Sequence, residues 1–239
     1  MYGWRLKIGI VSPANNVVIE PEFYRALPEG IAIYTTRMLI GDTLSMESLV
    51  TMEQNAKRGV KELAAAGVDV IVYACLATSL AKGPGWSEAF VEEVRQTTGL
   101  PATTAATATM EGLREIGIQR VAMGSAFPAS ISASAKHFFE SYKFRVVSEK
   151  CLGVSQVKDM GRIPPHVIYG LARDADVKQA DGVCLLATDI STLDVIENLE
   201  RDLRKPVVTT NQAILWKALG LGGIRACIPH AGRLLAGDR

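Results

Sequence analysis

The stretch VYACLATSLAKGPG, at residues 72–85, places Cys75 directly after an apolar run and before small and hydroxyl-bearing residues. A thiol at the end of a strand and near helix N-termini can have a lowered pKa and act as a nucleophile or a base. Cysteine is also among the most buried residue types, so Cys75 can equally fill space between a sheet and a helix. Position alone leaves both interpretations open.

The remaining cysteines and the histidines offer less chemistry. Cys184 lies inside an apolar run, two residues before its expected strand ends, which favours a packing role. The same interpretation applies to Cys151 and Cys227. The histidines lie far apart and show no metal-ligand spacing: His137, His166 and His230. The last of them, in IPHAGRLL, is the hardest to dismiss as a surface residue.

Phosphate-binding motifs are absent from the sequence. No GxGxxG follows an expected strand, and there is no Walker loop. The Gly-Pro-Gly at residues 83–85 contains a proline, which lacks a backbone donor, so it indicates a turn before a helix. Nucleotide binding is therefore not expected.

Strand and helix patterns alternate along the whole chain, which predicts parallel sheets covered on both faces. The expected strands cover residues 7–11, 31–35, 70–73, a short run after residue 100, 120–124, 144–149, 182–186 and 206–209. The expected helices cover residues 45–66, 86–97, 105–116, 130–142, 164–174, 192–203 and 212–219. Two buried strands are alike, VDVIVYACLATS and ADGVCLLATDIS, which suggests two related halves.

Ligands of such sheets bind beyond the carboxyl ends of the strands. The segments that begin there are rich in Ser, Thr and Asn and hold almost no carboxylate or histidine: residues 12–16, 35–37, 75–79, 124–127, 187–191 and 209–212. This composition predicts a pocket that binds an anion through neutral hydrogen-bond donors. It argues against metal-dependent hydrolysis.

Composition excludes several classes of partner. The chain has 239 residues, of which 48% are hydrophobic and 21% charged, and its net charge is +1. Nothing in this balance favours nucleic acid or an anionic membrane, and the apolar runs are too short to span a bilayer. The N-terminus lacks the long apolar region of a signal peptide, and the four cysteines form no CxxC pair. We expect a cytoplasmic protein with free thiols.

Several segments together carry a resemblance to a known family. They are IGIVSPANNVVIEPEF, TTRM at residues 35–38, YACLATSLAKGPG, KPVVTTNQAILWKAL and PHAGRLL. In this order and spacing they resemble the aspartate/glutamate racemase superfamily, and within it the branch of maleate cis-trans isomerases and arylmalonate decarboxylases. The resemblance covers nearly the whole chain.

The resemblance implies an α/β fold of two flavodoxin-like lobes with parallel sheets, related by a pseudo-twofold axis, with the active-site cleft between them. We expect residues 1–104 plus 210–239 in the first lobe and 105–209 in the second. It implies no metal or organic cofactor, a small carboxylate or dicarboxylate substrate, and a homo-oligomer, dimeric or larger. Cys75 takes the catalytic place. The implied substrate-binding residues are Asn16, Ser12, Ala77, Thr78, Ser79, Phe127, Ala187, Thr188 and Asn211.

Three positions depart from the family's pattern. The isomerases place a second cysteine across the substrate, and the aligned residue here is Ala187. A family tyrosine corresponds to Phe127, which cannot donate a hydrogen bond, and a family asparagine corresponds to Val157. Three polar positions are thus apolar in this chain.

Three functions remain open. The first is cis-trans isomerisation of maleate or a related dicarboxylate by thiolate addition from Cys75. The second is a cofactor-free decarboxylase or racemase-type enzyme in which Cys75 donates the proton. The third is a small-acid binding protein without catalysis, which the apolar replacements favour and the retained Cys75 and Asn16 oppose.

Overall fold

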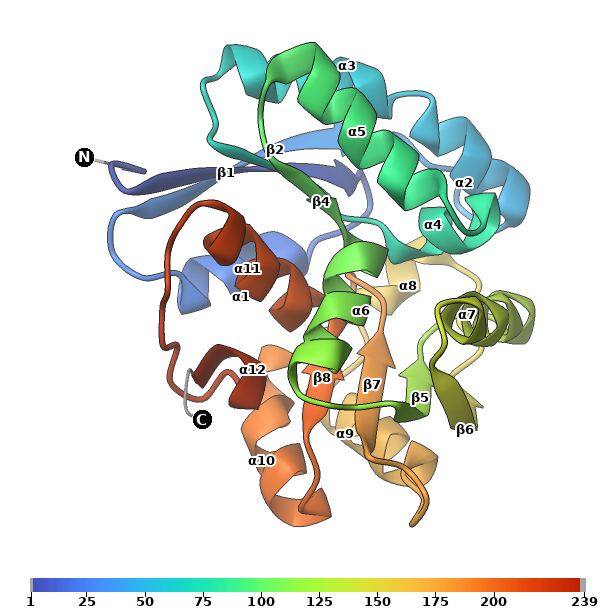
Figure 1. Cartoon of the computed structure of the whole chain (residues 1–239). Helices are drawn as coiled ribbons and strands as arrows, with labels where there is room; N and C mark the ends of the chain where they lie inside the picture. Colours follow the sequence, from blue (N-terminus) through green and yellow to red (C-terminus); the bar gives the residue numbers. More distant parts are fainter. Residues whose placement is uncertain (1, 237–239) are drawn as a thin grey trace.

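Two four-stranded parallel sheets organise the computed structural model, which describes residues 2–236 (Figure 1). The first sheet has the order β2-β1-β3-β4, formed by β1 (Leu6–Pro13), β2 (Ile31–Met38), β3 (Val70–Tyr73) and β4 (Ala102–Thr104). The second has the order β6-β5-β7-β8, formed by β5 (Arg120–Ser125), β6 (Arg145–Cys151), β7 (Gly182–Leu186) and β8 (Val207–Thr209). The same strand order in both sheets confirms the predicted fold of two related α/β lobes.

The central strands β3 and β7 explain why the sheets form where they do. Every residue of VIVY in β3 and of GVCLL in β7 is buried. Continuous apolar runs of this kind are typical of parallel strands that are covered by helices on both faces. The two lobes therefore each form around one such strand.

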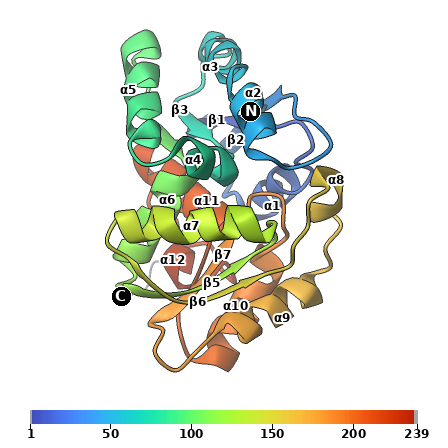
Figure 2. The same cartoon turned by 90° about the vertical axis from the view of Figure 1, so that its right-hand side faces the viewer.

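Helices surround both sheets. They are α1 (Ile19–Ala26), α2 (Met46–Glu53), α3 (Ala56–Ala65), α4 (Leu76–Lys82), α5 (Trp86–Thr98), α6 (Ala105–Glu115), α7 (Ala129–Ser141), α8 (Val157–Met160), α9 (Pro165–Ala175), α10 (Leu193–Leu203), α11 (Thr210–Leu221) and α12 (Arg233–Ala236). Helix α4 of the first lobe contacts α7 of the second (Figure 2).

Helices α6 and α11 lie between the sheets and pack against each other (Figure 1). Each follows the last strand of its sheet and begins at a threonine cap: Thr104 accepts from the Thr107 backbone N–H, and Thr209 accepts from that of Gln212. A Cβ at Gly112 of α6 would lie 3.4 Å from the Ala213 Cβ of α11, so the absence of a side chain there permits the close approach. Helix α11 contacts β3 and β4 as well as β7 and β8.

The predicted lobe boundaries at residues 104/105 and 209/210 fall at the starts of these two helices. Because both helices contact strands of both sheets, the assignment of each helix to one lobe stays a prediction. Residues 1 and 237–239 of the predicted first lobe lie outside the described part of the chain.

Four local predictions need correction. The single helix expected at 45–66 is divided into α2 and α3, because the Asn55 N–H bonds to the Met52 carbonyl and tightens the turn. Residues 35–37, expected after a strand, lie within β2, and residues 75–79, expected as a loop, enter α4. Helix α1 was not predicted, although Pro21 and two glutamates in its first turn are helix-start features.

A pair of glycine substitutions tests the packing at β7. A Cβ at Gly182 would lie 2.6 Å from the Pro206 carbonyl oxygen, and this backbone cannot yield as a flexible side chain can. We expect Gly182→Ala to reduce the free energy of unfolding by roughly 1–3 kcal/mol. Gly170 lies inside α9 with nothing within 4 Å of such a Cβ, so Gly170→Ala should stabilise by up to about 1 kcal/mol. Urea unfolding measures both, and equal effects would contradict this account.

Candidate active site

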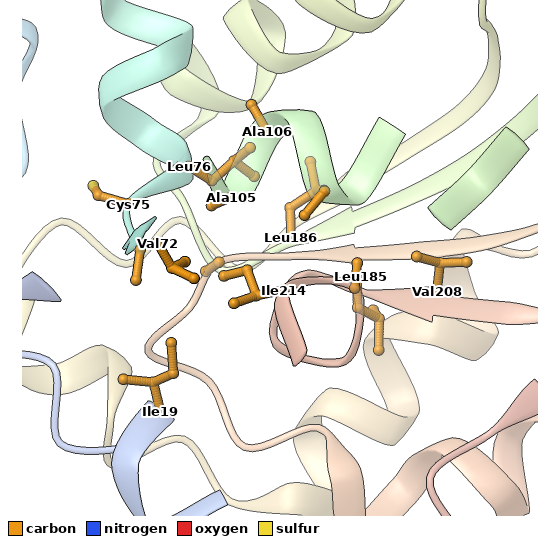
Figure 3. Close-up of a cluster of buried hydrophobic side chains, with 14 of the residues drawn as sticks. Ile19, Val72, Cys75, Leu76, Ala105, Ala106, Leu185, Leu186, Val208 and Ile214 are labelled. Carbon is orange, nitrogen blue, oxygen red and sulfur yellow. The ribbon is translucent and has the colours of Figure 1, made fainter. Parts of the chain in front are cut away.

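Cys75 lies between the end of β3 and the first turn of α4. Cys75 is 5% exposed. Its side chain points away from Ala105 and Ala106, whereas the side chain of Leu76 points toward them (Figure 3). The side chains of Cys75 and Leu76, adjacent at the start of α4, thus point in opposite directions. Leu76 packs against α6, and the thiol is left for the space between the lobes.

A short chain of hydroxyl groups ends on the thiol. The Tyr73 hydroxyl donates to Thr78 Oγ1 at 3.1 Å, and Thr78 Oγ1 donates to Cys75 Sγ at 3.3 Å. Burial nevertheless raises the pKa of Cys75 to about 11, against the lowering effect of this bond and of backbone N–H groups. The thiol is therefore protonated at neutral pH and needs a base to become a nucleophile.

The thiol lines a cavity between the lobes. Its volume is about 20 Å³, room for about one water molecule. A small acid therefore enters only if wall side chains move. Its walls are mainly apolar, and they consist of Pro13, Asn15, Ile40, Leu44, Leu49, Cys75, Leu76, Ala77, Phe127, Val157, Met160, Thr188 and Asp189.

Asp189 brings a carboxyl group to the same cavity. It accepts a long hydrogen bond from Asn15 Nδ2 at 3.4 Å, and this amide also donates to the Val157 carbonyl at 3.0 Å. Burial raises the pKa of Asp189 to about 6. Asn15 Oδ1 is buried and has no hydrogen-bond partner among residues 2–236. Two residues with oxygen acceptors, Asn15 and Asp189, thus line the cavity, and the carboxylate is not one of the neutral donors that the sequence predicted.

The segment after β7 holds Asp189 in place. Thr188 Oγ1 donates to the Ala74 carbonyl at 3.1 Å and accepts from Asn16 Nδ2 at 3.1 Å. Asn211 Nδ2 donates to the Thr188 carbonyl at 3.0 Å. Ala187 has φ of 120°, a value that residues with a side chain rarely adopt and that is concentrated at functional sites.

Glu22 anchors the same segment from α1. This buried carboxyl accepts hydrogen bonds from the backbone N–H groups of Thr192 and Leu193 and from Asn211 Nδ2 at 2.7 Å. Burial raises its pKa in spite of these bonds. Glu22 therefore joins the start of α10 to α11 and α1, and it lies outside the cavity wall.

Only some of the predicted site residues line the cavity. Cys75, Ala77, Phe127 and Thr188 do so, together with Val157. Asn16, expected to bind a carboxylate, has both side-chain atoms engaged, because its Oδ1 also accepts from the backbone N–H groups of residues 18 and 19.

The other predicted residues lie behind the wall. Ser12 and Asn211 are fully buried, and Thr78 contacts the thiol. Ser79 accepts from Ser87 in a separate hydroxyl cluster. Ala187 donates its N–H to Thr210 Oγ1 at 3.4 Å.

Sequence reasoning missed Asn15 and Asp189. Both lie in segments that were expected at strand ends, and Asn15 is next to the residue that was singled out. Among the cysteines, Cys184 is fully buried in β7, as predicted. The packing role predicted for Cys151 and Cys227 is wrong, because both are exposed. His230 is exposed and contacts Glu197 at 2.8 Å, away from the cavity.

Comparison with known proteins identifies the family. The family model described as arylmalonate decarboxylase matches residues 8–235. The chain belongs to the arylmalonate decarboxylase family. Within residues 2–236, no helix has the length and apolar character needed to cross a membrane.

The named relatives of this chain have two different activities. Maleate isomerase of Nocardia farcinica (strain IFM 10152) is 30% identical over 242 residues, covering 97% of this chain and 96% of that protein. Arylmalonate decarboxylase of Bordetella bronchiseptica is 28% identical over 237 residues, covering 93% and 96%. The predicted resemblance to this branch is thereby confirmed.

A solved structure extends the comparison. The Nocardia farcinica maleate cis-trans isomerase, as a variant with serine in place of a cysteine, superposes with a TM-score of 0.92 at 28% identity. The alignment covers 98% of this chain and 99% of that one. That structure contains a covalently bound succinylcysteine intermediate.

The raised pKa of Asp189 predicts a pH-dependent stability. Its pKa is about 6 in the folded chain against 3.8 ordinarily, so ionisation costs stability as pH rises through that range. We expect Asp189→Asn to raise stability at pH 8 by about 1 kcal/mol, or roughly 2–4 °C in Tm, allowing for its partial exposure. Below pH 4 the gain should disappear.

Asp181 provides the matched control, because its contact with Arg120 at 2.6 Å lowers its pKa to about 2. Asp181→Asn should lower Tm at pH 7, with the loss shrinking as pH falls toward 2. Thermal unfolding followed by circular dichroism across this range measures both variants. A stability loss for Asp189→Asn at pH 8 would contradict the assignment of a partly buried carboxylate that destabilises the fold when it ionises.

Proposed function

We propose that this protein is a cofactor-independent cis-trans isomerase of maleate or a related small dicarboxylate, with Cys75 as the nucleophile. The observation that carries the proposal is the position of the Cys75 thiol at the end of β3, on the wall of a cavity between the lobes. The succinylcysteine intermediate of the Nocardia farcinica isomerase supports the same type of chemistry.

The proposed reaction begins when the Cys75 thiolate adds to one alkene carbon. An S–C bond forms, and the π electrons move to the neighbouring carbon and its carboxylate. The former double bond is now single and can rotate. Expulsion of the thiolate then restores the double bond in the trans geometry. No metal or organic cofactor takes part in these steps.

The substrate-binding assignments also remain proposals. Ala77, Phe127 and Thr188 line the cavity and can contact the substrate directly. Thr78 acts on the thiol, and Asn16 and Asn211 act through Thr188. Ser12, Ser79 and Ala187 lie behind the wall, so contact with substrate requires the cavity to open.

We also propose that the protein works in the cytoplasm as a homo-oligomer, a dimer or larger. Four free cysteines suit a reducing compartment. Exposed aromatic side chains such as Tyr2, Trp4 and Tyr24 provide apolar surface for a second copy of the chain.

Replacement of Cys75 tests the isomerase. Proton NMR of the alkene signal should show conversion of maleate to fumarate by the unaltered protein. Cys75→Ala should reduce the rate by at least about 1000-fold, as is typical when a nucleophile is removed. The control is Cys151→Ser, at an exposed position, which should retain full activity. If neither the unaltered protein nor its Ala187→Cys variant converts maleate, the isomerase assignment is wrong.

The apolar cavity wall favours decarboxylation as the second candidate. Ile40, Leu44 and Leu49 line it beside the thiol, and such surroundings favour loss of neutral CO₂ from a carboxylate. The electron pair left on carbon forms an enediolate, and the Cys75 thiol would protonate it from one face. This mechanism fits a malonate that carries an apolar substituent.

Product chirality tests the decarboxylase. A prochiral aryl-substituted methylmalonate should yield one enantiomer, because a single thiol delivers the proton to one face of the intermediate. Chiral chromatography of the product measures this, and Cys75→Ala should abolish turnover. A racemic product, or turnover that survives the substitution, would rule out Cys75 as the proton donor.

A further inference from the structure

Asp189 and Cys75 are the only titratable side chains that line the cavity among residues 2–236. We propose that Asp189 is the proton carrier of this site, which takes the proton from the Cys75 thiol and delivers it to the substrate carbon. The proton transfers to and from the substrate rest on the isomerase function proposed above. The pairing of Asp189 with Cys75 does not depend on that function.

Hydrogen bonds bring the two groups together from opposite lobes. The bond from Thr188 Oγ1 to the Ala74 carbonyl joins the residue before Asp189 to the residue before Cys75. Asn15 Nδ2 binds the Asp189 carboxylate from the β1 side. The charge of Asp189 also raises the pKa of Cys75, which places the carboxylate within electrostatic reach of the thiol.

No second thiol is available for this role. Position 187, where the family resemblance places a second cysteine, is alanine. Cys184 is fully buried within β7 and does not line the cavity. Cys151 and Cys227 are exposed and do not line the cavity either.

The charge states suit a proton carrier. With the pKa of Cys75 at about 11 and that of Asp189 at about 6, the thiol is protonated and the carboxylate mostly ionised at neutral pH. The cavity wall contains no lysine, arginine or histidine within the described residues. Asp189 is therefore the base of this wall, and once protonated it is the acid. Because its pKa lies below that of the thiol, the proton moves to the carboxylate as the sulfur forms its new bond and not before.

The proposed cycle balances without any further reactant. As Cys75 Sγ forms a bond to one alkene carbon, the Asp189 carboxylate accepts the thiol proton. The carbanion formed on the neighbouring carbon takes the proton from the Asp189 carboxylic acid, which gives a saturated thioether. After rotation about the C–C bond, the Asp189 carboxylate removes a proton from that carbon, the freed electron pair forms the trans double bond, and the S–C bond breaks to leave the Cys75 thiolate. The Asp189 carboxylic acid then returns its proton to this thiolate.

Alkylation of Cys75 tests the pairing without substrate. All variants carry Cys151→Ser and Cys227→Ser, which remove the exposed thiols. The rate at which iodoacetamide labels Cys75 is measured by peptide mass spectrometry at a series of pH values. We expect the rate to rise with a midpoint near pH 6 and then level off, since ionised Asp189 acts as the base. Asp189→Asn should remove this rise and slow labelling at pH 7 by about 100-fold.

A role of Asp189 as a mere nearby charge predicts the opposite result. Loss of that charge lowers the pKa of Cys75, so Asp189→Asn would then label faster at pH 7. Faster or unchanged labelling overturns the proposal. Asp189→Ser, which also lacks the carboxyl group, repeats the measurement with a smaller side chain.

Measurement of the maleate isomerisation rate distinguishes a failure of the Asp189 proposal from a failure of the proposed isomerase function. If the protein isomerises maleate, Asp189→Asn should lose at least about 100-fold in rate, and adding Ala187→Cys should restore part of it through a second thiol. If the protein does not isomerise maleate but the rise near pH 6 is present, the isomerase assignment fails and the Asp189–Cys75 pair stands. Full isomerase activity of Asp189→Asn overturns the role of Asp189.

Discussion

One hydrogen bond between the halves of the chain, from Thr188 Oγ1 to the Ala74 carbonyl, fixes the geometry on which the rest of the site depends. It joins the ends of β3 and β7, the two central buried strands. The residues that follow these strands at their carboxyl ends, Cys75 and Thr188, both line the cavity between the lobes. Asn16 and Asn211 hold Thr188 from the neighbouring elements, so the first and second lobes meet in a defined register at this point.

Burial then determines the chemistry available there. The apolar wall keeps the Cys75 thiol neutral and raises the pKa of the Asp189 carboxyl to about 6, since a charge in such surroundings loses its hydration. A thiol in this state is a poor nucleophile until a proton leaves it. In the same surroundings a hydrogen bond to either group is stronger than it would be in water, because little water competes for it.

Much of the fold could be predicted from the sequence. The apolar runs of β3 and β7 and the alternation of strands with helices were sufficient to predict two parallel-sheet lobes. Helix α4 and the break between α2 and α3 were not predicted. Helix α4 packs against α2 and α7, and the break follows a turn in which the Asn55 N–H bonds to the Met52 carbonyl. Helix propensity alone encodes neither feature.

The site was predicted less completely, for a related reason. Position at a strand end left Cys75 open between a catalytic and a packing role, and the family resemblance selected it as catalytic. The same resemblance pointed to Asn16 and gave no indication of Asn15. Asn15 lines the cavity, whereas Asn16 accepts hydrogen bonds from backbone N–H groups at the start of α1 and donates one to Thr188. Asp189 was one carboxylate in a segment of hydroxyl residues, and nothing in that local pattern shows that it lines the same cavity as the thiol.

The sequence by itself therefore determined the fold class, the family resemblance, and a thiol at the end of a buried strand, since these follow from local patterns. Only the tertiary structure decided which side chains share the cavity and what their pKa values are. Those properties depend on contacts between residues more than 100 positions apart, such as Ala74 with Thr188, and on burial that arises when the two lobes close against each other.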